Sequence, residues 1–221
     1  MSIPMSRSSA EPTPRQRSIL DAALRRFAHY GFRRTSMEEI AREAELSRSA
    51  LYQHFGSKEE ILRALSAHLY AQALAAAEEG ASAEGRLDER LYRVLDAKMG
   101  FFYELLRGSE HGVEILDENN RLCGDITARS AEAYVGILAR VIADGQRRGE
   151  FSPQKSGLEP DDTAEFFVRC AEGLTGTPSN SPSPARYRLR LRQLVEVLVT
   201  GFGGRRRPTR GRNASGARSA R

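Results

Sequence analysis

The sequence predicts an all-α protein of about nine helices. Between residues 13 and 202, apolar side chains recur every three to four positions, which is the period of a helix packed on one face. No stretch alternates β-branched or aromatic residues with polar ones, as strands do. Serine or threonine precedes several of the periodic segments, and both are favoured helix N-caps.

The composition sets the broad class of protein. Of the 221 residues, 40% are hydrophobic, which is enough for a core and excludes a disordered chain. No apolar run approaches the roughly 20 residues of a membrane span, and the first residues lack the apolar segment of a signal peptide. The only cysteines, Cys123 and Cys170, cannot form a disulfide framework. We therefore expect a cytoplasmic protein.

The charge is concentrated at the two ends of the chain. The formal net charge is +5, yet residues 203–221 contain arginine and no acidic residue. Residues 1–12 and 203–221 are rich in small and polar residues, and we interpret them as a flexible arm and a disordered tail. Basic ends suggest a polyanionic partner, although a solvated tail is the simpler alternative.

Four helices are expected in the first part of the chain. Thr13, Pro14 and Gln16 have the spacing of a capping box with proline at the first helical position, and Gly31 ends this helix. The next three helices begin after Thr35 or Ser36, after Ser47, and after Ser57. The longer helices that follow are expected at residues 85–107, 121–148, 161–175 and 185–202.

The segment 35–58 is the most informative. Two helices of fewer than about ten residues flank a three-residue turn at 45–47. Helices this short are marginal alone and need a tight crossed contact. The DNA-binding helix-turn-helix has this shape, with its second helix in the major groove. The alternative is a small helical hairpin without that role.

Helical phase predicts which face of residues 48–55 is exposed. Leu51 and Phe55 share the buried side, and Ser49 and Gln53 lie opposite them. Glutamine can form a bidentate pair with adenine, and Ala50 can contact a thymine methyl. The side chains expected on phosphate oxygens are Thr35, Arg48, Tyr52, His54 and Lys58.

Residues 17–65 resemble the N-terminal domain of TetR-family transcriptional regulators. The matching residues are Ile19, Ala22, Ala23, Phe27, Gly31, Thr35, Ser36, Ile40, Ala41, Ala44, Leu46, Ser47, Leu51, Tyr52, His54, Phe55, Lys58, Glu59 and Leu62. The resemblance implies an all-helical homodimer with a small DNA-binding domain and a larger domain for ligand binding and dimerisation. It also implies DNA contacts by Thr35, Ser47, Tyr52, His54 and Lys58.

Combined with the helical phase, this gives ten expected DNA contacts. They are Thr35, Ser36, Ser47, Arg48, Ser49, Ala50, Tyr52, Gln53, His54 and Lys58. Two positions depart from the family pattern, because Glu45 replaces a usual glycine in the turn and Ser49 replaces another. If the turn needs a positive φ, Glu45 costs about 1 kcal/mol.

The domain boundaries follow from this resemblance. We expect a DNA-binding domain at residues 13–74 and a ligand-binding and dimerisation domain at residues 75–202. Late apolar stripes suggest a four-helix dimer interface. Its expected residues are Phe166, Cys170, Leu174, Tyr187, Leu191, Leu194, Val195 and Leu198. The alternative is that these stripes face the core of one protomer.

A ligand pocket is expected from aromatic residues mixed with a few polar ones. The candidates are Phe102, Tyr103, Leu106, His111, Tyr134, Ile137 and Phe167, with an ordinary core position as the alternative for each. His111, Glu114 and Cys123 lack the spacing typical of a metal site, so we expect no metal and no cofactor. Cys123 and Cys170 fit buried small hydrophobes better than a redox switch.

The sequence therefore predicts a transcriptional regulator that binds double-stranded DNA. A repressor that binds a palindromic operator as a dimer and is released by a small-molecule effector is favoured over an activator or a ligand-independent regulator. No nucleophile elbow, P-loop or dinucleotide fingerprint is present, so an enzyme is not expected. The alternative from a different class is a non-specific polyanion-binding protein that acts through its arginine-rich tail.

Overall fold

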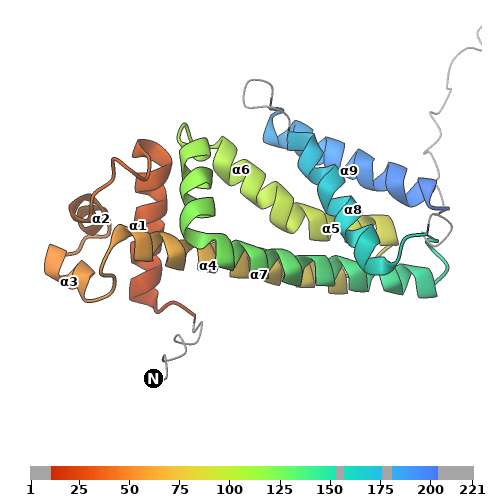
Figure 1. The fold of residues 1–221 in the computed structure, drawn as a ribbon, viewed down its shortest axis with the longest axis horizontal. Coiled ribbons are helices and arrows are strands. Elements are labelled where there is room, and N and C mark those ends of the chain that lie inside the picture. The colour runs from red at the N-terminus through yellow and green to blue at the C-terminus, as the bar shows by residue number, and fades with distance from the viewer. Residues whose placement is uncertain (1–10, 153–156, 176–180, 204–221) are drawn as a thin grey trace, which may run out of the picture.

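The computed structural model describes residues 11–152, 157–175 and 181–203 as an arrangement of helices without strands (Figure 1). The expected arm and tail lie almost wholly outside these ranges. The helices are α1 (Pro14–Tyr30), α2 (Met37–Glu43), α3 (Arg48–Tyr52), α4 (Lys58–Ser82), α5 (Leu87–Leu95), α6 (Phe101–Arg107), α7 (Gly112–Arg147), α8 (Pro160–Glu172) and α9 (Pro184–Gly201). The predicted all-α class is confirmed.

The expected caps of the first helices are present. At α1, the Thr13 hydroxyl accepts from the Gln16 backbone N–H while the Gln16 side chain accepts from the Thr13 N–H. Ser36 rather than Thr35 caps α2, in a second capping box with Glu39. Gly31 follows α1 with a φ of 84°, a conformation that glycine adopts without strain.

Helices α5 and α6 form one continuous rod across a π-helical segment at Asp96–Gly100. This agrees with the single helix expected at 85–107, while the π segment was not predicted. Periodicity alone does not distinguish a local widening of the helix from a regular turn.

Helix α7 differs from the expectation, because it begins at Gly112 and not near residue 121. The charged and amide side chains of its first turns interrupt the apolar periodicity that predicts a helix. Contacts with α1 and α4 stabilise these turns. At Cys123 the backbone leaves helical geometry, with φ −123° and ψ 19°, so the helix bends. Arg63 of α4 binds this bend through the Leu122 carbonyl and the Asp125 carboxylate.

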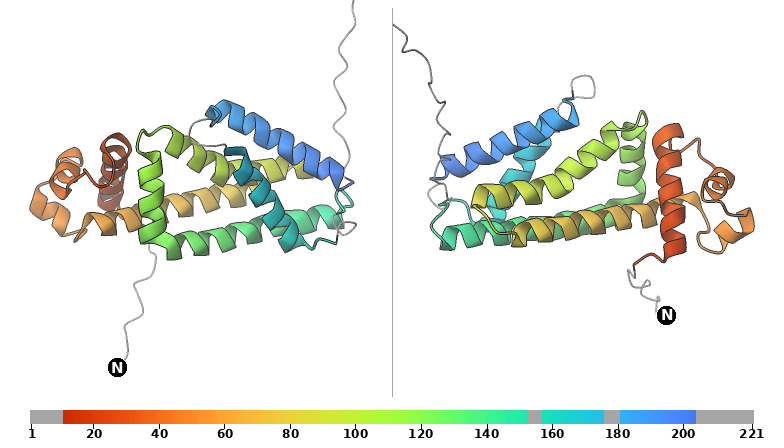
Figure 2. Two further views of the ribbon diagram at one scale, coloured as in Figure 1. Left: turned by 45° about the horizontal axis from the view of Figure 1, so that its top comes forward. Right: turned by 180° about the vertical axis from the view of Figure 1, so that it is seen from behind.

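The molecule has two hydrophobic cores along one long axis. The first joins α1, α2, α3 and the start of α4 around Phe27, Ile40 and Leu51. The second joins α5, α7, α8, α9 and the end of α4 around Leu91 and Phe167. The long helices α4 and α7 run side by side between them, and α2 and α3 lie at one extreme of the molecule (Figures 1 and 2).

No helix in the described ranges is both long and apolar enough to cross a membrane. The longest, α7, carries charged residues along its whole length.

Candidate nucleic-acid interface

The turn between α2 and α3 has the positive φ at residue 45 that glutamate adopts only at a cost. Glu45 has a φ of 56° and is the only residue other than glycine with positive φ in the described part of the chain. The turn is closed by backbone bonds from Glu45 to Arg42 (3.1 Å) and from Leu46 to Ala41 (2.8 Å). Glu45 therefore occupies a positive-φ conformation that glycine adopts without strain and that costs a glutamate free energy.

The predicted orientation of α3 is confirmed by burial. Leu51 is fully buried and Phe55 nearly so, in the first core. Ser49 and Gln53 are exposed on the opposite side, and Tyr52 and His54 are exposed beside them. Since the centre of this face carries only small groups and one amide, the helix can approach the base edges of a major groove.

The start of α3 is shaped by hydroxyl and charge contacts. The Ser47 hydroxyl accepts from the Ala50 N–H at 3.2 Å and lies 3.1 Å from the Ser49 hydroxyl. Arg48 forms an ion pair of 2.6 Å with Glu38 of α2. The Arg48 side chain is 65% exposed, so the guanidinium remains accessible at the margin of the face.

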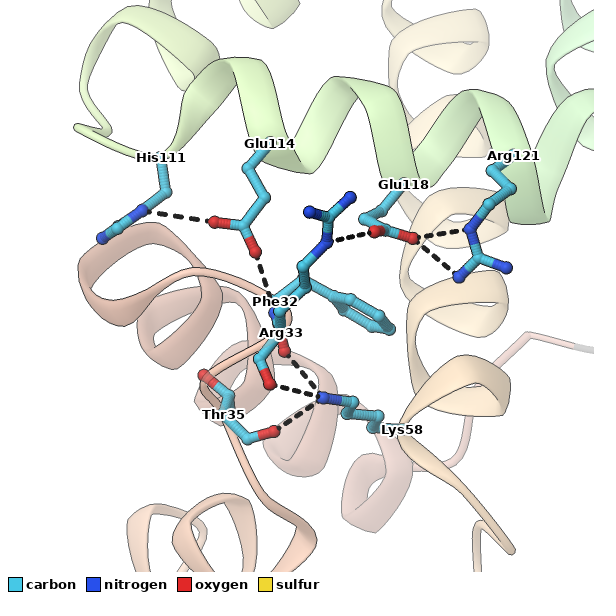
Figure 3. Close-up of polar contacts among 8 residues, drawn as sticks. All are labelled: Phe32, Arg33, Thr35, Lys58, His111, Glu114, Glu118 and Arg121. Atoms are coloured by element: carbon cyan, nitrogen blue, oxygen red, sulfur yellow. Dashed lines mark hydrogen bonds and ion pairs between the residues drawn. The ribbon is translucent and has the colours of Figure 1, made fainter.

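Thr35 and Lys58 lie close together, but their polar groups are used inside the domain (Figure 3). The Thr35 side chain is buried, and its hydroxyl donates to the Gly31 carbonyl at 2.7 Å. The Lys58 ammonium donates to the carbonyls of Phe32, Arg33 and Thr35 at 2.9, 3.0 and 3.1 Å. An ammonium has three donors, so these bonds occupy all of them.

Two exposed arginines were missed by the sequence reasoning. Arg34 precedes Thr35 in the α1–α2 loop, and Arg42 lies on α2. Neither forms an ion pair within the described residues, so both guanidinium groups are free to meet phosphate. The sequence signal for Arg34 was the basic pair Arg33–Arg34 directly before Thr35.

The same loop is tied to the first turns of α7. The Arg33 backbone N–H donates to the Glu114 carboxylate at 2.8 Å, and His111 Nδ1 lies 3.4 Å from the same group. The Arg33 side chain pairs with Glu118 at 2.8 Å, and Arg121 also bonds Glu118 (Figure 3). Hydrogen bonds from Arg33 and Arg121 hold the pKa of Glu118 below its usual range.

The residues expected to form a ligand pocket are divided between two places. Phe102 and Leu106 line a cavity beside α1, and His111 pairs with Glu114 near it. Tyr103, Tyr134, Ile137 and Phe167 are packed in the second core. There the Tyr134 hydroxyl donates to the Val94 carbonyl at 3.1 Å, and burial raises the Tyr134 pKa. These four residues fit the ordinary-core alternative.

The expected dimer residues are also divided. Tyr187, Leu191 and Val195 are at most 1% exposed and pack inside one protomer, so we exclude them from an interface. Cys170, Leu174, Leu194 and Leu198 are partly exposed and Phe166 is exposed. Leu189 and Val197, which the sequence reasoning omitted, expose 55% and 67% of their surface.

Cys123 does not join His111 and Glu114, because its side chain is packed in the first core. Burial raises the pKa of its thiol. The described residues contain no group of three histidine, cysteine or acidic side chains arranged to hold a metal ion.

Comparisons with known proteins support the same interpretation of the interface. Residues 19–65 match the family of bacterial regulatory proteins called the tetR family. The A-factor receptor protein of Streptomyces griseus is 30% identical over 160 residues, which is 72% of this chain but only 52% of that protein. The HTH-type transcriptional repressor KstR2 of Rhodococcus jostii is 28% identical over 182 residues, covering 76% of this chain and 85% of the relative.

Solved structures agree with the fold. A crystal structure assigned to the TetR family, from Rhodococcus sp., superposes with a TM-score of 0.66 and 26% identity, covering 85% of this chain and all of that one. A regulator from Saccharomonospora viridis in complex with choline gives a TM-score of 0.65 at 23% identity, over 82% of this chain and 95% of its own.

The helix-turn-helix and its exposed second helix define a DNA-binding transcriptional regulator. Through residues 19–65, this DNA-binding domain belongs to the tetR family of bacterial regulatory proteins.

Proposed function

We propose that this regulator is a repressor that binds a palindromic operator as a homodimer and is released by a small-molecule effector. The observation that carries the proposal is the exposed face formed by Ser49 of α3 and by Gln53, the residue that caps the end of α3, with Leu51 buried on the opposite side. The relative KstR2 is named as a repressor, which favours repression over activation.

The proposed DNA contacts are sorted by what each side chain can reach. Gln53, Ser49 and Ala50 meet base edges at the centre of the groove. Tyr52, His54 and Arg48 meet phosphates at its margins, joined by Ser36, Ser47, Arg34 and Arg42. Thr35 and Lys58 hold the α1–α2 loop in place, so they affect DNA binding only through the position of that loop.

The proposed dimer surface is the outer face of α8 and α9. Phe166 of α8 exposes 42% of its surface, and Leu189 and Val197 of α9 expose 55% and 67% of theirs. Leu194 and Leu198 of α9 are also partly exposed. These helices lie on the body of the molecule away from α3 (Figure 2). A two-fold dimer formed through this face would leave both α3 helices free to bind DNA.

A ligand is proposed because the domain beyond α4 is far larger than DNA binding requires. One solved relative of the same fold was crystallised with choline. A repressor is released when a ligand binds better to an arrangement of the two DNA-binding domains that does not fit the operator.

The test is a selection of bound duplexes from a random pool, with light scattering of the protein at micromolar concentration. The proposal predicts an imperfect palindrome and a dimer. Equal recovery of all sequences, with affinity that follows only the salt concentration, would instead support the non-specific polyanion-binding alternative.

A further inference from the structure

An apolar cavity of about 70 Å³ lies where the helix-turn-helix domain meets the rest of the chain. Eleven of its fifteen lining residues are apolar, and α1 contributes three of them: Leu24, Phe27 and Ala28. Leu116, which lines the cavity, is 43% exposed, so the cavity is open to solvent and a ligand can reach it. A concave apolar lining with a few polar groups is typical of a ligand site.

The other lining residues place polar groups on the α4–α7 side of the cavity. Ser66 donates to Asn119 Oδ1 at 2.6 Å, Asn119 Nδ2 donates to Thr127 at 3.3 Å, and Thr127 donates to the Tyr70 hydroxyl at 3.3 Å. Within the described residues, this series of hydrogen bonds leaves one amide proton of Asn119 and the phenolic proton of Tyr70 without an acceptor. Two such donors match a carbonyl oxygen, which has two lone pairs.

No charged side chain lines the cavity. A charged ligand would lose its hydration there without gaining an ion pair, which is costly. The lining therefore favours an uncharged molecule that is mainly apolar and carries one carbonyl group.

The cavity also lies against the contact that fixes α1. Ser109, in the connection between α6 and α7, donates to the Ala28 carbonyl at 2.7 Å, and both residues line the cavity. Helix α1 in turn holds α2 through the pairs Arg26–Glu39 at 2.7 Å and Arg25–Glu43 at 2.8 Å. A molecule larger than the cavity must separate α1 from α7 or α4, and α2 would move with α1.

We infer that this cavity binds an uncharged apolar molecule with a carbonyl oxygen, and that the ligand acts on DNA binding by direct contact with α1. The inference rests on the proposed function and deepens it, because the ligand touches the DNA-binding domain itself. Tyr70 and Asn119 orient the carbonyl, while Phe27 and Ala28 receive the apolar part.

The test uses three probes with the same chain length: 2-octanone, octanoate and octylammonium. Binding to the full-length protein is followed by thermal melting, and binding to a duplex recovered from the selection is followed by fluorescence anisotropy. We expect 2-octanone to raise the melting temperature and weaken DNA binding about fivefold or more, and the two charged probes to do neither.

Three variants test whether the response to 2-octanone comes from this cavity. Ala28→Leu fills the cavity from α1 and should abolish the response to 2-octanone. Ala75→Leu makes the same change on the exposed side of α4 and should respond as wild type does. Tyr70→Phe removes one donor and should weaken 2-octanone binding by about three- to tenfold.

The inference is overturned if octanoate binds as well as 2-octanone, or if Ala28→Leu retains the wild-type response. If 2-octanone binds without changing the affinity for DNA, the claim that the ligand controls DNA binding is wrong. Failure of the unliganded protein to select any duplex would contradict the proposed function instead, while melting with 2-octanone would still test the cavity.

Discussion

Arg33 and Glu118 form an ion pair of 2.8 Å although 85 residues separate them in the sequence. Arg33 lies in the loop that precedes the helix-turn-helix, and Glu118 lies on α7, so the pair joins the two parts of the protein (Figure 3). Glu118 is nearly buried and also binds Arg121. This contact between the two parts of the protein therefore uses an ionised carboxylate.

This dependence predicts how acid affects the protein. Since its hydrogen bonds lower the pKa of Glu118 in the folded state, its contribution to stability is complete above the usual glutamate pKa of about 4.3 and is lost as pH falls toward the lowered value. Glu118→Gln should therefore show a shallower fall in melting temperature below about pH 5 than wild type. Parallel melting curves across this range would contradict the assignment.

Lys58 tests whether an expected phosphate contact is instead structural. Lys58→Met removes three hydrogen bonds to loop carbonyls, and we expect the free energy of unfolding to fall by about 1.5–3 kcal/mol in urea titrations. The salt dependence of DNA binding should not change. Unaltered stability, combined with a weaker salt dependence of DNA binding, would instead show that Lys58 contacts phosphate.

Glu45 tests the strained turn. Glu45→Gly should raise the free energy of unfolding by about 1 kcal/mol, because glycine adopts a φ of 56° without the steric cost of a β-carbon. Glu45→Ala is the matched control, since it removes the side chain but keeps the strain, and it should bring no comparable gain. Equal stabilisation by both variants would point to the carboxylate rather than the backbone.

The outer face of α9 tests the proposed dimer. Val197→Glu and Leu189→Glu should each retain helix content and favour monomers, because both side chains are exposed in one protomer. Leu191→Glu should unfold the domain instead, since it places a charge in the second core. Light scattering and circular dichroism distinguish the two effects. Unchanged dimers of both surface variants would exclude this face.

The local elements could be predicted because their signals are local. The capping box at Thr13 and the caps Ser47 and Ser57 mark where helices begin, and helical phase alone placed Leu51 inside and Gln53 outside. The first turns of α7 were missed because their stability comes from contacts with distant segments, such as Glu118 with Arg33.

Side-chain roles that depend on packing could not be predicted. The lysine at position 58 fits a phosphate contact by type, yet three carbonyls from the α1–α2 loop surround its ammonium. An apolar stripe on α9 does not show whether it faces the protomer core or a partner, so Leu191 was expected in the dimer interface although it is fully buried.

The central claim is that the protein reads DNA sequence through Gln53, the residue that caps the C-terminal end of α3. The most direct measurement is a selection from random duplexes with wild type, Gln53→Ala and Tyr52→Phe, with thermal melts as the control for folding. We expect Gln53→Ala to cost about 1–3 kcal/mol on the selected site and to relax preference at one base pair per half-site. Tyr52→Phe should weaken all duplexes alike and keep the preference. Full sequence preference in Gln53→Ala, or altered preference in Tyr52→Phe alone, would contradict the account.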